Sequence, residues 1–170
     1  MDIVRLSERL MGMKDEVWLR HTNPWSVWTR VLTPLPLLAL AIWSRAWIGG
    51  WAWVAVGVVL VWVWINPRAF SRPKTFESWS AQGVLGERVW LQHRDKIAAY
   101  HIRAAKVLAY VSGLGLLPFA DGLWAYGLGF TCLGIVVISG GKIWFVDRMA
   151  WIWSDFLRDG GSIDDLTSRN

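Results

Sequence analysis

Residues 47–66 read WIGGWAWVAVGVVLVWVWIN, twenty consecutive positions without a charged side chain. A helix needs about 20 apolar residues to cross the ~30 Å hydrocarbon layer of a bilayer. Residues 122–141, GLWAYGLGFTCLGIVVISGG, are uncharged over the same length. Both segments predict transmembrane helices and place the chain among integral membrane proteins.

A shorter apolar run precedes each of these segments, VLTPLPLLALAIWS at residues 31–44 and VLAYVSGLGLLPFA at residues 107–120. Runs of this length rise only about 21 Å as a helix, so flanking residues must contribute and basic side chains must extend to the headgroups. We expect both runs to span the membrane. The alternative is a re-entrant or interfacial pair, which Pro34, Pro36 and Pro118 would permit because proline removes helix hydrogen bonds.

The composition excludes several classes of protein. Of the 170 residues, 54% are hydrophobic and 18% are charged, which argues against an ordinary soluble domain. The single Cys132 rules out a disulfide within the chain, and the three histidines are too dispersed for a metal site. We therefore predict no metal and no cofactor. The net charge of +5 needs no nucleic-acid partner, because the basic residues follow membrane topology.

The distribution of arginine and lysine predicts the orientation. Five basic residues precede the first span, eight lie in residues 68–106 and four follow the last span, whereas the two tight turns hold only Arg45 between them. Basic residues favour the cytoplasmic side. We expect both termini and the long loop in the cytoplasm of a multi-pass plasma (inner) membrane protein, with the turns near Arg45 and Asp121 outside.

The predicted architecture is an all-α, polytopic membrane helical bundle that forms one domain over residues 1–170. Four transmembrane helices, at about 27–45, 47–66, 104–120 and 122–146, form two hairpins joined by a cytoplasmic loop, 67–103. Apolar residues at alternating three- and four-residue steps predict an N-terminal amphipathic helix over residues 3–18. A second short amphipathic helix is expected over residues 76–90.

The segment after the last uncharged run, GKIWFVDRMAWIWSD at residues 141–155, has its acidic residues and Arg148 at helical spacing. As a helix it places Trp144, Asp147, Arg148, Trp151 and Asp155 on one face. Positive-inside anchoring accounts for the cations, but the carboxylate of Asp147 needs a donor. A pseudo-twofold relation between the hairpins would bring the end of the second span close to it, so we expect Asn66 and Arg68 beside Asp147.

These polar clusters supply the candidate site. We predict catalytic roles for Asp147 and Glu87 as proton donor or base, and substrate contacts from arginine, asparagine and tryptophan side chains: Asn23, Arg30, Asn66, Arg68, Arg88, Arg148, Trp25, Trp144 and Trp151. The competing interpretation is structural. Most of the 15 tryptophans lie near helix ends, where they anchor membrane proteins, and the cations would be ordinary anchors paired with carboxylates.

Four strings, RHTNPWSVWTR (20–30), NPRAF (66–70), VLGERVW (84–90) and GKIWFVDRMAW (141–151), resemble an uncharacterised prokaryotic family of small Trp-rich integral membrane proteins, a domain of unknown function. The resemblance covers about residues 8–156. It implies the four-span arrangement and no particular activity.

Two classes of function remain open at this point. The first is an enzyme or binder that acts on an amphiphilic lipid or isoprenoid at the cytoplasmic interface, with membrane lipids as partners. The second is a non-catalytic scaffold, or a small transport or channel subunit; the near absence of polar residues at midplane counts against an ion pathway. Neither class fixes whether the protein forms a homo-oligomer.

Overall fold

The computed structural model describes residues 15–167, and the regular secondary structure in that range is entirely helical. The elements are α2 (Asp15–His21), α3 (Pro24–Leu32), α4 (Pro34–Trp43), α5 (Arg45–Ile48), η1 (Gly49–Trp51), α6 (Ala52–Ala69), α7 (Trp79–Gln92), η2 (Arg94–Lys96), α8 (Ala99–Leu114), α9 (Leu116–Ala125), α10 (Leu128–Arg158) and α11 (Asp164–Thr167).

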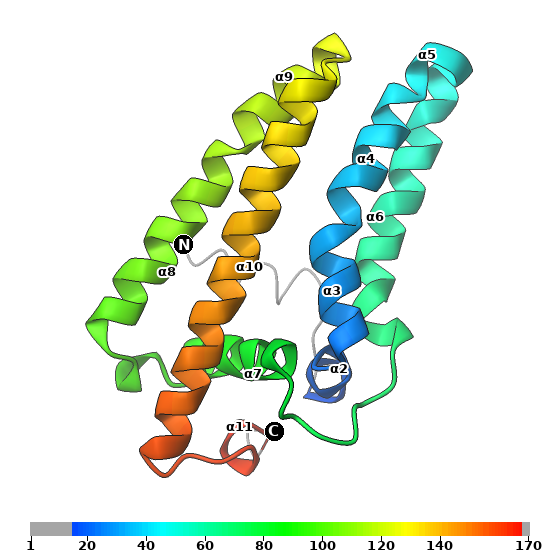
Figure 1. The fold of residues 1–170 in the computed structure, drawn as a ribbon. Helices are drawn as coiled ribbons and strands as arrows, with labels where there is room; N and C mark the ends of the chain where they lie inside the picture. Colours follow the sequence, from blue (N-terminus) through cyan, green and yellow to red (C-terminus); the bar gives the residue numbers. More distant parts are fainter. Residues whose placement is uncertain (1–14, 168–170) are drawn as a thin grey trace.

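Within residues 15–167, three helical stretches are long and apolar enough to cross a membrane: Pro24–Ala69, Ala99–Ala125 and Leu128–Arg158. Figure 1 shows α3 and α4 running beside α6, and α8 and α9 running beside α10. The shorter helices α2, α7 and α11 gather at one end of the molecule, opposite the turns at α5 and after α9. The chain is therefore consistent with a multi-pass membrane protein.

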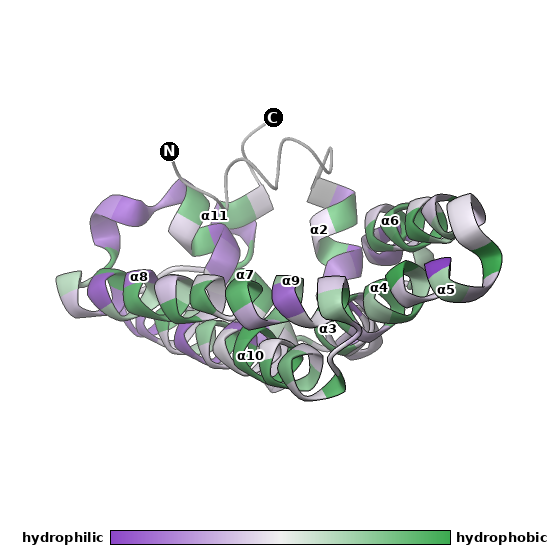
Figure 2. Ribbon diagram, turned by 90° about the horizontal axis from the view of Figure 1, so that it is seen from above, coloured by the Kyte–Doolittle hydropathy of each residue, from purple (hydrophilic) through white to green (hydrophobic). Residues whose placement is uncertain are grey.

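Hydropathy follows the same division. In the view along the long helices, α4 and α6 are mostly green to pale, and purple gathers around α2 and in segments beside α11 (Figure 2). Large apolar side chains are exposed along α6, including Trp53, Val58 and Leu60 at 59–70% of their surface. A soluble protein would not leave such a continuous apolar surface in water.

Local sequence explains where the first stretch begins and bends. The Asn23 side chain caps α3, because its Oδ1 accepts a hydrogen bond of 3.0 Å from the Trp25 amide, and Pro24 occupies the first turn. The α3 helix ends at Leu32 and α4 restarts at Pro34, whose ring cannot continue the hydrogen-bond ladder of the preceding turn. The predicted first span is thus two helical pieces.

The turns at the far end differ from the prediction in one respect. Asp121 lies within α9, and the chain reverses at Tyr126 and Gly127 instead. Tyr126 adopts a left-handed backbone with φ of 55° and caps α9. The guanidinium of Arg45 donates to the carbonyl oxygens of Leu123 and Trp124, both at 2.7 Å, and lies 4.1 Å from the Tyr126 ring. Arg45 thereby ties this turn to α5, and it satisfies carbonyls that a helix end leaves unpaired.

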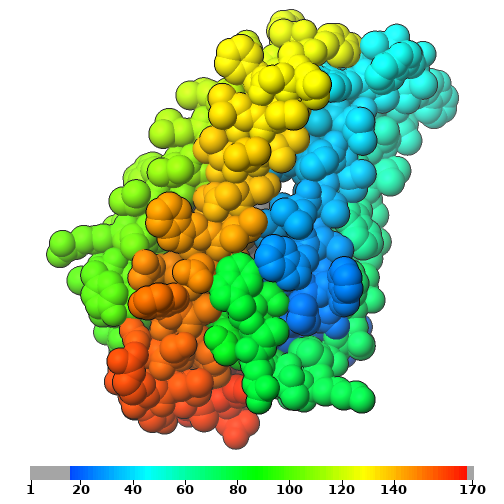
Figure 3. Space-filling view, in the orientation of Figure 1, coloured from blue at the N-terminus to red at the C-terminus, as the bar shows by residue number. Residues whose placement is uncertain are grey.

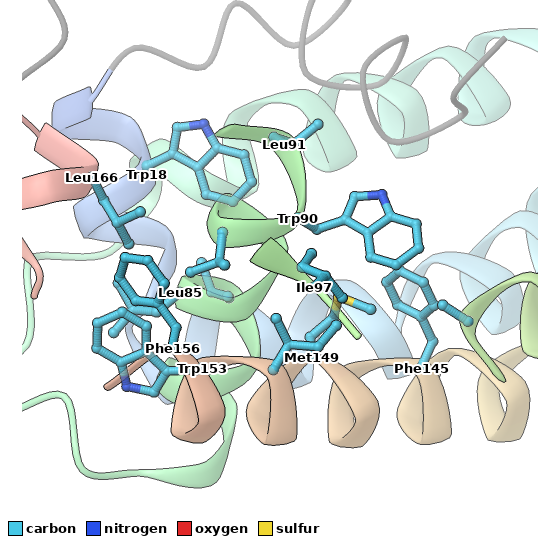
Figure 4. Packing of buried hydrophobic residues seen from close by; sticks show 14 of the residues in the cluster. Trp18, Leu85, Trp90, Leu91, Ile97, Phe145, Met149, Trp153, Phe156 and Leu166 are labelled. Carbon is cyan, nitrogen blue, oxygen red and sulfur yellow. The ribbon is translucent and has the colours of Figure 1, made fainter. Parts of the chain in front are cut away.

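The main hydrophobic core lies at the opposite end, where α7 packs across α10. Figure 4 shows Phe145, Met149, Trp153 and Phe156 of α10 directed toward Leu85, Trp90 and Ile97, with Trp18 and Leu166 completing the cluster. Gly86 permits this packing. A Cβ at that position would lie 1.8 Å from the Met149 carbonyl oxygen, so the two backbones are in direct contact.

The two predicted amphipathic helices have different outcomes. The helix α7 confirms the short helix predicted over 76–90, shifted by a few residues. Of the helix predicted over 3–18, residues 3–14 lie outside the described part of the chain, and residues 15–18 belong to α2. Trp18 of α2 is 4% exposed and packs in the main core.

Candidate functional site

A buried polar network joins α2, α3 and α6. The Ser26 hydroxyl donates to Asn66 Oδ1 at 3.2 Å, and the Asn66 amide donates to Thr29 Oγ1 at 2.8 Å. Thr29 in turn donates to the Trp25 carbonyl. His21 Nδ1 lies 2.8 Å from Ser26 Oγ, and because the single hydroxyl proton of Ser26 is used on Asn66, Nδ1 must carry the proton in this bond. His21, Ser26, Thr29 and Asn66 form what we call the polar network.

The imidazole of His21 is held neutral in this network. Burial lowers its pKa well below the usual 6.5, and the positive charges of Arg30 and Lys142 lower it further. Asn66 and Ser26 are completely buried, and their polar side-chain atoms form hydrogen bonds within the network. Asn66, predicted to contact a substrate, is thus enclosed in the network.

The predicted acid Glu87 lies on α7 and pairs with Lys142 of α10, with 2.8 Å between Oε1 and Nζ. The Glu87 side chain is only 13% exposed. Arg30 of α3 is close enough to interact electrostatically with Glu87. The structure therefore brings together three residues from the two halves of the chain, and the carboxylate is engaged by a cation.

The carboxylate of Asp147 has a partner that charge pairing did not predict. Its Oδ1 accepts a hydrogen bond of 2.8 Å from the indole nitrogen of Trp79, at the start of α7. The Trp79 ring is stacked on Trp28 of α3, with 5.5 Å between ring centroids. Arg68, the predicted partner, donates to the Trp64 carbonyl and lies 4.3 Å from the Trp64 ring.

Arg148 follows Asp147 and lies against a tryptophan. Its guanidinium carbon is 5.3 Å from the centroid of the Trp151 ring. Its Nε is buried and has no hydrogen-bond partner within residues 15–167. Trp144, one turn earlier on the helix, is 61% exposed and Trp151 is 58% exposed. We call these six residues the tryptophan face: Trp28, Trp79, Trp144, Asp147, Arg148 and Trp151.

Figure 3 shows this face of the molecule. Ring-bearing side chains from the orange part of the chain (α10), from the green start of α7 and from the blue α3 lie side by side there. The predicted contacts Trp144, Arg148 and Trp151 share one face of α10 with Asp147, because they lie three or four residues apart along the helix. Trp25 on α3 is also exposed, at 70%.

Two other predicted contacts serve the fold. The Arg88 side chain is 6% exposed, and its Nε and Nη2 donate to the Leu166 carbonyl oxygen at 3.0 and 2.9 Å, which fastens α11 to α7. Asn23, besides capping α3, donates to the Ser71 carbonyl at 3.0 Å. Neither side chain lies on the tryptophan face.

Sequence reasoning missed a cavity of about 240 Å³ between the start of α8 and the end of α10. It contains His101, whose Nε2 lies 2.9 Å from Asp155 Oδ2, and Tyr100, whose hydroxyl donates to the same oxygen at 3.3 Å. Arg158 donates to the other carboxylate oxygen. The only signal in the sequence was Asp155 on the charged face of residues 141–155, since His101 is far away in the chain.

The described residues contain no group of three or more histidine, cysteine, aspartate or glutamate side chains arranged to hold a metal ion. The chemistry available to the tryptophan face is that of a guanidinium, a carboxylate and indole rings. Such groups bind anions and apolar chains, and a carboxylate can exchange protons.

A family model described as "Family of unknown function (DUF6653)" matches residues 4–169. No curated protein and no solved structure matches the chain. The match covers nearly the whole chain, as the resemblance in the sequence indicated.

Proposed function

The chain belongs to this family of unknown function, and from the geometry of its own residues we propose that it binds an anionic amphiphile at the cytoplasmic face of the plasma membrane. The proposal has two parts. The first is a four-span topology with both termini in the cytoplasm, and the second is a headgroup site on the tryptophan face.

The length of the first apolar stretch supports four spans. Residues 24–69 comprise 46 residues, about 69 Å of helix, which is more than twice the ~30 Å of hydrocarbon. The chain reverses near Gly49, whose φ of 56° favours glycine, and α4 then packs against α6. This stretch therefore supplies two crossings, and α8 with α9 and α10 supply two more, in two hairpins.

The orientation follows from charge. The end that holds α2, α7 and the loop before α8 carries most of the basic residues, whereas Arg45 is the lone basic residue of the two tight turns. Arg45 has its own structural reason to be there, because it caps carbonyls of α9. The basic end is cytoplasmic in our proposal, and the tryptophan face then lies at the level of the inner-leaflet headgroups.

The single observation that carries the binding proposal is the state of Arg148. Its buried Nε has no hydrogen-bond partner in residues 15–167, and the neighbouring carboxylate of Asp147 is directed to Trp79 instead. A buried, unsatisfied donor on a cation costs free energy. The Arg148 side chain as a whole is only half-buried, so a phosphate oxygen can reach its guanidinium and supply a charge-assisted bond. The exposed rings of Trp144 and Trp151 would flank the headgroup and the first part of the acyl chain.

Asp147 is the acid or base candidate in this arrangement. One carboxylate oxygen is held by the Trp79 indole, and the residue adjoins the cation that would bind the anion. Glu87 is held by Lys142, which makes it a poorer candidate. A reaction at the bound headgroup would use Asp147, whereas a pure binder needs only Arg148 and the rings.

The second candidate is a non-catalytic scaffold, and the polar network favours it. Its donors and acceptors satisfy one another with no exposed atom at Asn66 or Ser26, as expected of a structural lock between helices. The two candidates are separated by whether a ligand prefers the tryptophan face.

The test is an affinity measurement on the full-length protein, delipidated in neutral detergent. Native mass spectrometry would compare phosphatidic acid with phosphatidylcholine of the same chain length for wild type, Arg148→Gln and Lys106→Gln. Lys106 is an exposed cation on α8 and serves as the matched control. Because a hydrogen bond to a charged group contributes about 1.5–3 kcal/mol, Arg148→Gln should weaken phosphatidic acid binding roughly tenfold or more.

The control should keep nearly the wild-type affinity for phosphatidic acid. Equal losses in the two variants would show that only general positive charge matters, and an absent preference for the anionic lipid would leave the scaffold as the better account. The same spectra report the oligomeric state.

A further inference from the structure

The cavity between α8 and α10 forms a second site, separate from the tryptophan face. On α10, Asp155 lies eight residues beyond Asp147, about 12 Å along the helix axis. The headgroup layer adds only about 5–8 Å to each side of the hydrocarbon. In the topology proposed above, which puts Asp147 at the headgroup level, the cavity opens to water on the cytoplasmic side.

The carboxylate of Asp155 in this cavity already has partners of its own. Both oxygens of Asp155 are engaged, one by His101 and Tyr100 and the other by Arg158. Asp159, the other acidic residue of the lining, is exposed. The carboxylate of Asp155 is thus a fixed element that positions the His101 ring.

Two side chains of the lining, those of His101 and Lys96, are available to a ligand. The His101 side chain is 1% exposed, and its Nδ1 is buried without a hydrogen-bond partner. Lys96 is exposed, its Nζ lies 5.8 Å from the Phe156 ring, and its charge interacts electrostatically with the Asp165 carboxylate. An unpartnered buried imidazole nitrogen is costly, and the Lys96 ammonium in the lining of the same cavity favours a negatively charged ligand.

The backbone adds a third feature of the same sign. The cavity is lined by Ala98 and Tyr100, where the 16-residue helix α8 begins. No side chain caps this helix, and its first turn holds no acidic residue. Free amide groups and the helix dipole at such an end attract anions, and phosphate is the usual ligand.

We propose that this cavity binds a small, water-soluble organic anion carrying a phosphate or carboxylate group. The anion contacts the amides at the start of α8 and the Lys96 ammonium, and a hydroxyl group of the ligand donates to His101 Nδ1, because Nε2 of this ring already faces the Asp155 carboxylate. The volume of about 240 Å³ equals roughly eight water molecules at ~30 Å³ each, which suits a compound of the size of glycerol phosphate.

The test uses the histidine signals of the full-length protein in lipid nanodiscs. The chain has only three histidines, so the ring nitrogens of His21, His93 and His101 can be followed separately by NMR after selective labelling. Inorganic phosphate, glycerol 3-phosphate and citrate are the probes, each added alone. At least one should shift the His101 signals saturably and leave those of the enclosed His21 unchanged.

Two variants make the result specific. Lys96→Gln changes an exposed side chain and should raise the midpoint of the titration at least tenfold, whereas Arg103→Gln, an exposed cation on the same helix as His101, should leave it within about twofold. Equal effects of the two variants would overturn the proposal, as would the absence of a saturable shift with all three probes.

A comparison of nanodiscs distinguishes the source of the anion. Phosphatidic acid in place of phosphatidylcholine, without added probe, should leave the His101 signals unchanged. A shift caused by the lipid alone would overturn the assignment to a water-soluble ligand. Because Arg148 takes no part in this site, Arg148→Gln should bind the probe as wild type does.

Discussion

The contact between α7 and α10 can be tested by adding a single side-chain carbon at Gly86. In Gly86→Ala the new Cβ would lie 1.8 Å from the Met149 carbonyl oxygen and 2.5 Å from its carbonyl carbon. Ordinary contacts of this kind begin near 3.4 Å, so the helices must separate by more than an ångström. Overpacking of a core typically costs about 1–3 kcal/mol, and a clash with backbone belongs at or above the upper end because no side chain can move aside.

A loss of about 3 kcal/mol lowers the melting temperature of a chain of this size by about 6–12 °C. Gly113→Ala is the matched control, since a Cβ there meets nothing within 4 Å and alanine is the better helix former by about 0.5–1 kcal/mol. Thermal unfolding in neutral detergent, followed by circular dichroism, would measure both. If Gly86→Ala and Gly113→Ala have the same melting temperature, α7 does not pack on the α10 backbone as described.

The remaining predictions concern single residues. Because the fold holds His21 neutral while the unfolded chain binds a proton near pH 6.5, stability should fall as the pH drops below that value, and His21→Gln should flatten this dependence of the melting temperature. Asp147→Asn keeps an oxygen for the Trp79 indole and should cost less than about 1 kcal/mol, whereas Asp147→Leu strands the donor and should cost about 1–3 kcal/mol; equal melting temperatures would contradict the hydrogen bond. In a background without Cys132, a cysteine at the exposed Lys74 should react with an impermeant reagent only after the cells are opened, and labelling of intact cells would reverse the topology.

Much of the fold follows from the sequence because the bilayer constrains it strongly. Uncharged runs of about 20 residues predict apolar helices, and a one-sided polar pattern predicts α7. The break before α4 is also visible, since Pro34 stands where the helix restarts. The second turn was predicted near Asp121 and lies at Tyr126 instead, because Tyr126 adopts its left-handed backbone in a turn that Arg45 of α5 fastens.

The site was only partly predictable, for a physical reason. Charge pairing suggested a cation for Asp147, yet the fold supplies an indole donor from Trp79, a residue 68 positions away in the chain. His101 and Asp155, separated by 54 positions, meet only because α8 packs against α10. The sequence suggests that Arg88 contacts a ligand. In the structure α11 packs against α7, and the Arg88 guanidinium donates to the Leu166 carbonyl oxygen instead. Such contacts depend on tertiary packing, which residue spacing does not encode.

The most direct test of the binding proposal is to map where an anionic lipid lies. A photoactivatable phosphatidic acid, with its reactive group next to the phosphate, would be crosslinked to the protein in nanodiscs and the labelled peptides identified by mass spectrometry. The proposal predicts labelling of the α10 segment around Trp144, Arg148 and Trp151, reduced by Arg148→Gln and absent with the matching phosphatidylcholine probe. Equal labelling of this segment by both probes, unaffected by Arg148→Gln, would contradict a headgroup site on the tryptophan face.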